Sequence, residues 1–145
     1  MDDILALDVS AQEPLFGTNL DSFRLINAYS TNTRDHRVHS VRPNNLFPTL
    51  DVPLLVLGDL NIHNPLTDPL RSCAPREIGH STPCFEKAAE AGFALLNPPG
   101  EYTRFPLVGK ARPSVIDLAF TNPLLLPFSN HGKSPSPRQA LTMCQ

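Results

Sequence analysis

The 145-residue sequence contains no tryptophan, and aromatic residues make up only 7% of it. It also lacks an excess of charge of either sign, because 12 basic residues stand against 14 acidic ones and the net charge is −2. A protein that binds nucleic acid through a broadly basic surface is therefore excluded. A local cation, often a metal ion, can still serve phosphate chemistry, so nucleic-acid substrates remain open.

Membrane segments and secretion signals are also lacking. No apolar run approaches the length that spans a bilayer, and the acidic N-terminus has no basic region typical of a signal or transit peptide. The three cysteines, Cys73, Cys84 and Cys144, show no paired spacing, which argues against a disulfide scaffold and fits no common zinc module. We therefore expect an intracellular protein, cytoplasmic or nuclear, without a membrane partner.

Proline, by contrast, is abundant. The chain has 16 prolines spread along its length, which favours strands, turns and loops over a helical bundle. Apolar runs bounded by turn residues predict strands at 4–9, 23–29, 53–58, 93–96 and 114–120. Thr82 as a cap and Pro83 at the first helical position predict a helix that ends before Gly92. These elements predict one α+β domain.

The expected strand 53–58 is the most continuously apolar, so we predict that it is central and covered on both faces. It runs into Gly58, after which Asp59, Asn61 and His63 alternate with Leu60 and Ile62. If the backbone stays extended there, the three polar side chains share one face.

A carboxylate, an amide and an imidazole on one face suit phosphate-ester chemistry. The carboxylate orients or deprotonates water, the amide donates to a phosphoryl oxygen, and the imidazole moves a proton. The alternative is structural, because a Gly-Asp pair after a strand is often only a turn, and Asn and His are ordinary loop residues. The spacing alone leaves both interpretations open.

The run 58–63 (GDLNIH) becomes more specific in combination with other segments. They occur in a fixed order, as 25–29 (LINAY), 92–97 (GFALLN), 102–105 (YTRF) and 112–120 (RPSVIDLAF). Together they resemble the endonuclease/exonuclease/phosphatase superfamily, and most closely the apurinic-endonuclease-like domain of non-LTR (LINE-type) retrotransposons. The resemblance covers most of residues 1–126, and we expect residues 127–145, with their Ser-Pro repeats, to be a disordered tail.

The resemblance implies a four-layer α/β/β/α sandwich, only partial here, and Mg²⁺-dependent (or Mn²⁺-dependent) cleavage of a phosphodiester, typically a nick in DNA. It gives Asp59 the water-activating and metal-binding roles, and Asn61 the amide that stabilises the pentavalent phosphorus. Tyr29 is implied near the scissile phosphate, and Asp117 is implied to orient a catalytic histidine. Without the family, Tyr29 would be a half-buried strand residue and Asp117 a strand carboxylate with a structural hydrogen bond.

Two further residues, His63 and Thr103, are placed at the substrate by the same resemblance, without a catalytic role. The sequence also departs from the family pattern, because it shows neither the first strands with their Asn and metal-binding Glu nor the last strand with Ser-Asp-His. We therefore expect a domain truncated at both ends, in which Asp59 alone binds Mg²⁺ weakly. The alternative function is a catalytically inactive remnant, and the sequence indicates no protein partner.

Overall fold

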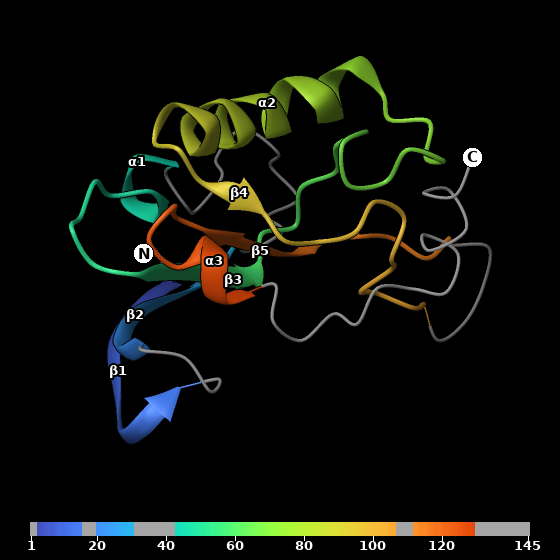
Figure 1. Ribbon diagram of the computed structural model, residues 1–145. Helices are drawn as coiled ribbons and strands as arrows, with labels where there is room; N and C mark the ends of the chain where they lie inside the picture. Colours follow the sequence, from blue (N-terminus) through green and yellow to red (C-terminus); the bar gives the residue numbers. More distant parts are fainter. Residues whose placement is uncertain (1–2, 16–19, 31–42, 107–111, 130–145) are drawn as a thin grey trace, which may run out of the picture.

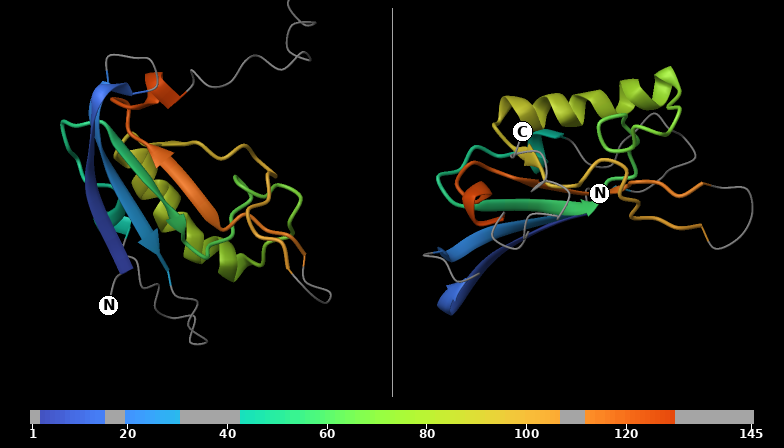
Figure 2. Two further views of the ribbon diagram at one scale, coloured as in Figure 1. Left: turned by 90° about the horizontal axis from the view of Figure 1, so that it is seen from below. Right: turned by 45° about the vertical axis from the view of Figure 1, so that its right-hand side comes forward.

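The computed structural model describes residues 3–15, 20–30, 43–106 and 112–129, and these form a mixed β-sheet with the longest helix packed against one face (Figures 1 and 2). The strand order in this five-stranded sheet is β1-β2-β3-β5-β4. The strands are β1 (Asp3–Leu15), β2 (Leu20–Tyr29), β3 (Leu54–Asp59), β4 (Ala94–Leu95) and β5 (Asp117–Thr121), and the helices are α1 (Pro43–Leu46), α2 (Pro75–Glu90) and α3 (Leu126–Ser129). The predicted α+β class is confirmed.

Strand β3 has the central position that its apolar sequence predicts. It pairs in parallel with β2 and antiparallel with β5. Leu54 and Val56 are buried beneath the helices, whereas Leu55 and Leu57 on the opposite face are only partly buried. The prediction that β3 is covered on both faces is therefore wrong for the described residues, because alternate side chains of a strand point to opposite faces and helices cover one of them.

The core lies between the sheet and α2. Alternate side chains of β2, β3 and β5 meet the buried face of α2 and a cluster of aromatic rings. Phe120 makes edge-to-face contacts with Phe47 and Phe85, with ring centroids 5.1 and 5.9 Å apart, and Phe47 contacts Phe93 at 5.2 Å. The other main core residues are Ile26, Ala28, Leu54, Val56, Cys84, Ala88, Val115 and Leu118.

Helix α2 begins earlier than the sequence predicts. It starts at Pro75, where Glu77 accepts a hydrogen bond from the backbone N–H of Ala74 at 2.8 Å and so caps the first turn. Thr82 is not the cap, because its hydroxyl donates to the carbonyl of Ile78 at 2.7 Å inside the helix. Pro83 is consequently a residue of the helix interior, and the predicted start at this proline is wrong.

The end of α2 agrees with the prediction. Gly92 has a φ of 75°, a left-handed conformation that glycine adopts without strain. Its N–H donates to the carbonyl of Ala89 at 3.0 Å, and the N–H of Phe93 donates to the carbonyl of Ala88 at 2.8 Å. These bonds satisfy carbonyls at the helix end and turn the chain into β4.

The face of the sheet that points away from α2 is open. Leu5 and Leu7 of β1 are 54% and 46% exposed. Through their register partners on β2, they lie on the same face as Leu57 and Leu55 of β3. The described residues thus supply one sheet and its helical layer, two of the four layers of the expected sandwich. Residues 130–145 of the expected tail lie outside the described residues.

None of the helices in the described ranges has the length and apolar character that crossing a bilayer requires.

Candidate functional site

The register of the sheet brings three predicted site residues into one row. Asp59, the last residue of β3, pairs with Tyr29 at the end of β2 and with Asp117 at the start of β5. Directly paired residues on neighbouring strands point to the same face, with Cβ atoms roughly 5 Å apart. The hydroxyl of Tyr29 and the two carboxylates therefore face one side of the sheet, at the same end.

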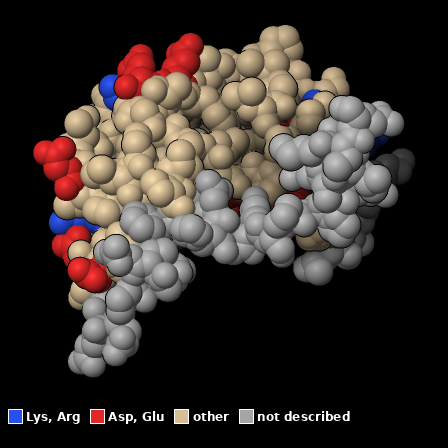
Figure 3. Space-filling view, in the orientation of Figure 1, with Lys and Arg blue, Asp and Glu red and all other residues tan. Residues whose placement is uncertain are grey.

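This row lies in an open groove of about 530 Å³ on the sheet face away from α2. Tyr29 is 48% exposed there, so its hydroxyl is accessible to a ligand. The groove is lined by Asn27, Ala28, Tyr29, Leu57, Gly58, Asp59, Asn97, Thr103, Asp117, Leu118 and Ala119. Elsewhere, acidic side chains gather over α2, on the other side of the sheet, and much of the described surface in that view carries no charge (Figure 3).

Gly58 permits the close approach of β2 and β3 beside the site. Its φ is 148°, and a Cβ atom at this position would lie 1.8 Å from the carbonyl oxygen of Ala28. A side chain here would push the two strands apart. The glycine therefore keeps the strand pairing that sets Asp59 beside Tyr29.

Strand β3 ends at Asp59, so the expected extended run through Asn61 and His63 is wrong. Asn61 has a left-handed backbone with φ of 49°, which asparagine tolerates better than most residues. Its N–H donates to Oδ1 of Asp59 at 3.0 Å, and its Nδ2 donates to the carbonyl of Ser30 at 2.6 Å. The residue thus closes a turn that orients the Asp59 carboxylate, and it is not among the described residues that line the groove.

His63 lies in a separate polar cluster that leads into α2. Burial lowers the pKa of its imidazole, and the nearby charge of Arg71 lowers it further. Its Nδ1 is buried without a hydrogen-bond partner, as are Oδ1 of Asp68 and Nε of Arg71. The structure does not bring His63 into the lining of the groove.

Thr103 anchors the start of β5. Its Oγ1 accepts hydrogen bonds from the backbone N–H groups of Ile116 at 3.1 Å and Asp117 at 3.0 Å. Thr103 therefore holds Asp117 in place and lines the groove as well, and its expected contact with substrate stays a prediction.

Asn97 lines the groove, although its sequence context predicts no role for it. Its Nδ2 donates to the carbonyl of Asp117 at 3.0 Å, and its Oδ1 accepts from the N–H of Ala119 at 2.7 Å. These two bonds replace strand pairing beyond the short β4. The available clue was a polar residue directly after an apolar run, at 93–96.

The electrostatics of the groove favour a cation. Burial raises the pKa of Asp59, and the adjacent charge of Asp117 raises it further, whereas the hydrogen bond from Asn61 and the charge of Arg104 lower it. Two neighbouring carboxylates repel each other when both are ionised, and a bound cation relieves this repulsion.

The donor set fits Mg²⁺ or Mn²⁺. Magnesium usually takes one or two protein carboxylates, and water and substrate phosphate complete its octahedron. Asp59 and Asp117 supply such a pair, whereas the sequence offered Asp59 alone. The described residues contain no group of three or more His, Cys, Asp or Glu side chains that would hold a metal, and no histidine is among those that line the groove.

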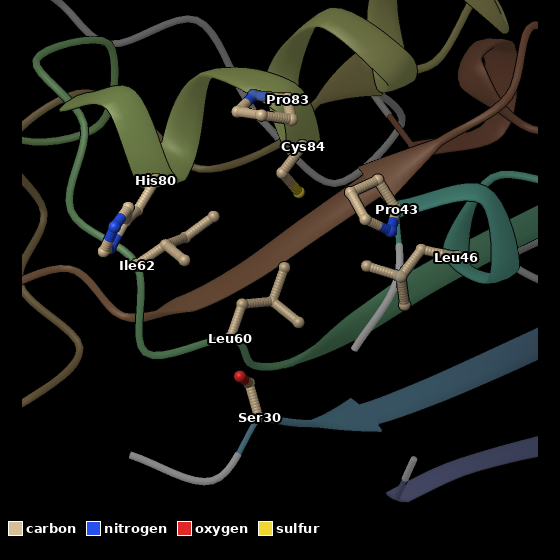
Figure 4. Close-up of a pocket in the computed structure, with 8 residues that line it drawn as sticks. All are labelled: Ser30, Pro43, Leu46, Leu60, Ile62, His80, Pro83 and Cys84. Atoms are coloured by element: carbon tan, nitrogen blue, oxygen red, sulfur yellow. The ribbon is translucent and has the colours of Figure 1, made fainter. Parts of the chain in front are cut away.

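A second, smaller cavity of about 110 Å³ lies on the other side of the sheet, beneath α2 (Figure 4). Apolar side chains from α1, α2 and the segment after β3 line most of it, together with Ser30 and His80. Burial raises the pKa of the Cys84 thiol to about 12, so this cysteine stays protonated and is a poor nucleophile. This cavity adds no catalytic group to the groove.

Comparisons with known proteins agree with this architecture. The Endonuclease/Exonuclease/phosphatase family matches the sequence over residues 17–138. Among solved structures, the endonuclease domain of TRAS1, a telomere-specific non-LTR retrotransposon, is similar with a TM-score of 0.56 and 15% sequence identity. The match covers 86% of this chain and 52% of that one, so the chain spans about half of the TRAS1 domain. No curated protein matches the sequence.

Proposed function

Because the chain belongs to the endonuclease/exonuclease/phosphatase family, we propose that its groove hydrolyses a phosphodiester bond of DNA, as a magnesium- or manganese-dependent endonuclease. The observation that supports this most strongly is the row of Tyr29, Asp59 and Asp117 on three adjacent strands. Within this proposal, residues 1–126 are the central part of an endonuclease domain.

Asp59 is assigned as the group that orients and deprotonates the attacking water. One of its oxygens accepts the hydrogen bond from Asn61, which fixes the carboxylate and leaves the other oxygen for water or a cation. Asn61 acts here through Asp59, in place of the direct contact to phosphorus that the resemblance implies.

Tyr29 and Asp117 complete the site. Tyr29, which is half exposed in the groove, is assigned to donate its hydroxyl hydrogen to a phosphate oxygen. Asp117, held by Thr103 and Asn97, shares the binding of a divalent cation with Asp59. When bound, this cation supplies positive charge that offsets the two carboxylates and the substrate phosphate.

Nicking of supercoiled plasmid in the presence of Mg²⁺ tests the proposal. We expect wild-type protein to convert plasmid to the open-circular form, and chelation of the metal to stop this. Asp59→Ala should lower the rate by about 100-fold or more, the usual contribution of a positioned general base. Asp21→Ala is the matched control, because Asp21 is exposed at the opposite end of β2. Equal nicking by wild type and Asp59→Ala would contradict the proposal.

The second candidate, a catalytically inactive remnant, has one observation in its favour. In the described residues, no histidine side chain accompanies the carboxylates, and the groove supplies two metal-ligand candidates rather than three. The same assay decides, because wild-type protein at micromolar concentration without any nicking supports the remnant.

A further inference from the structure

Two aromatic side chains that flank Thr103 of the groove in the sequence are exposed to solvent. Phe105 is 68% exposed and Tyr102 is 37% exposed, and their rings meet edge to face with centroids 6.4 Å apart. Phe47, Phe93 and Phe120, by contrast, are buried in the core. Exposing this much aromatic surface costs hydrophobic stabilisation, so the pair marks a candidate binding surface.

Backbone hydrogen bonds fix this segment to the residues just before β5. Arg104 and Ser114 form a bridge, with N–H to carbonyl distances of 2.9 and 3.0 Å in the two directions. The side chain of Thr103, between the two aromatic residues, accepts the N–H of Asp117 and lines the groove. The aromatic pair is therefore held at the rim of the groove, within two residues of its wall.

Arg104 adds a positive charge to the same rim. It is exposed, and its charge acts on Asp59, where it opposes the rise in pKa that burial of that carboxylate causes. A cation beside acidic groups is complementary to a phosphate that must approach them. We call Tyr102, Arg104 and Phe105 the aromatic rim.

We propose that the aromatic rim binds an unstacked nucleobase and its adjacent phosphate, so that the groove takes single-stranded or locally opened nucleic acid. This inference rests on the proposed nuclease function and names its substrate class. Bases stack on exposed aromatic rings whatever their sequence, and an arginine nearby binds the backbone and strengthens the stack. Bases inside an intact duplex present no free ring face to such a surface.

Fluorescence anisotropy with labelled 12-nucleotide probes tests this, in EDTA so that no cleavage intervenes. We expect single-stranded DNA to bind about tenfold more tightly than a strand of the same length and charge made of abasic residues. Phe105→Ala should remove this difference, and Phe105→Trp should keep it. Leu124→Ala is the matched control, because Leu124 is 47% exposed and follows the other end of β5.

A second measurement, tyrosine fluorescence, reports directly on the ring of Tyr102. The sequence has two tyrosines and no tryptophan, so Tyr29→Phe leaves Tyr102 as the only tyrosine emitter. We expect single-stranded DNA to quench this emission and the abasic strand to leave it unchanged. Equal affinity for both strands, or absence of binding to either, would overturn the proposal that the aromatic rim binds a nucleobase. Equal affinity would leave the proposed nuclease function standing, because plasmid nicking tests that function independently.

Discussion

At the scale of single residues, Asp59 and Asp117 are the proposed catalytic carboxylates, and their pairing also has a cost in stability. Like charges on directly paired strand positions destabilise a sheet. The sequence, through the family resemblance, singled out Asp59, Asp117 and Tyr29 as site residues, but not the strand register that pairs them. The pairing of residues 58 positions apart depends on strand order and register, which local patterns do not determine. The left-handed backbone of Asn61 was equally hidden, because the alternation of residues 59–63 also fits an extended strand.

Replacing Asp59 by asparagine should stabilise the fold at neutral pH. The pKa of Asp59 is raised in the folded protein, so the folded state holds this proton more tightly than the unfolded chain. The resulting loss of stability is absent below the unfolded pKa of 3.8 and is complete above the raised folded value. We expect Asp59→Asn to raise the free energy of unfolding at pH 7 by about 0.5–1 kcal/mol, and to have no such effect near pH 3.

Thermal unfolding at both pH values measures this. Asp21→Asn serves as the control, because Asp21 is exposed and lies away from the groove. A variant at position 59 that is less stable than wild type at pH 7 would contradict the raised pKa of Asp59, which has burial as its main cause and the charge of Asp117 as a further one.

At the scale of elements, the strands were largely predictable and the main helix only at its end. Apolar runs located all five strands to within a few residues, apart from the longer extent of β1. Gly92 marked the end of α2 because the left-handed backbone conformation at a helix end favours glycine over other residues. The start was missed because Thr82-Pro83 imitates a capping pair, while the actual cap depends on the reach of the Glu77 side chain back to Ala74.

The pairing of β2 with β3 gives a prediction at this scale. Gly58→Ala should destabilise the protein by about 2–4 kcal/mol, because the new methyl group meets the Ala28 carbonyl and the backbone has a positive φ. Gly79→Ala is the matched control. No atom lies within 4 Å of its added Cβ, and alanine in an exposed helix stabilises by about 0.5–1 kcal/mol. Urea denaturation of both variants provides the measurement, and equal stabilities would contradict the close strand approach.

At the scale of the whole molecule, the described residues bury one face of the sheet and leave the other open. The four-layer expectation came from the family alone, since alternation within a strand shows that a face is apolar but not what covers it. On the open face, Leu5 and Leu7 belong to β1, which has a neighbouring strand on one side only in the described sheet. An exposed apolar edge strand favours association between molecules.

Polar substitutions of Leu5 and Leu7 should therefore change the association of the protein more than its free energy of unfolding. We expect the double variant Leu5→Ser, Leu7→Thr to bind less hydrophobic dye and to associate less with rising concentration. Its free energy of unfolding should stay within about 1 kcal/mol of wild type, since both side chains are largely exposed. Leu66→Ser with Leu70→Thr, exposed positions outside the sheet, is the control. Dye binding that falls equally in both variants would argue against a special role of the open face.

The most direct test of the catalytic carboxylate pair is a double-mutant cycle on plasmid nicking. The rate is measured at saturating Mg²⁺ for wild type, Asp59→Ala, Asp117→Ala and the double variant. Residues that act as one unit are strongly non-additive, so we expect the double variant to be about as slow as the slower single variant. Effects that multiply as for independent sites, or wild-type rates in either single variant, would contradict a shared site at Asp59 and Asp117.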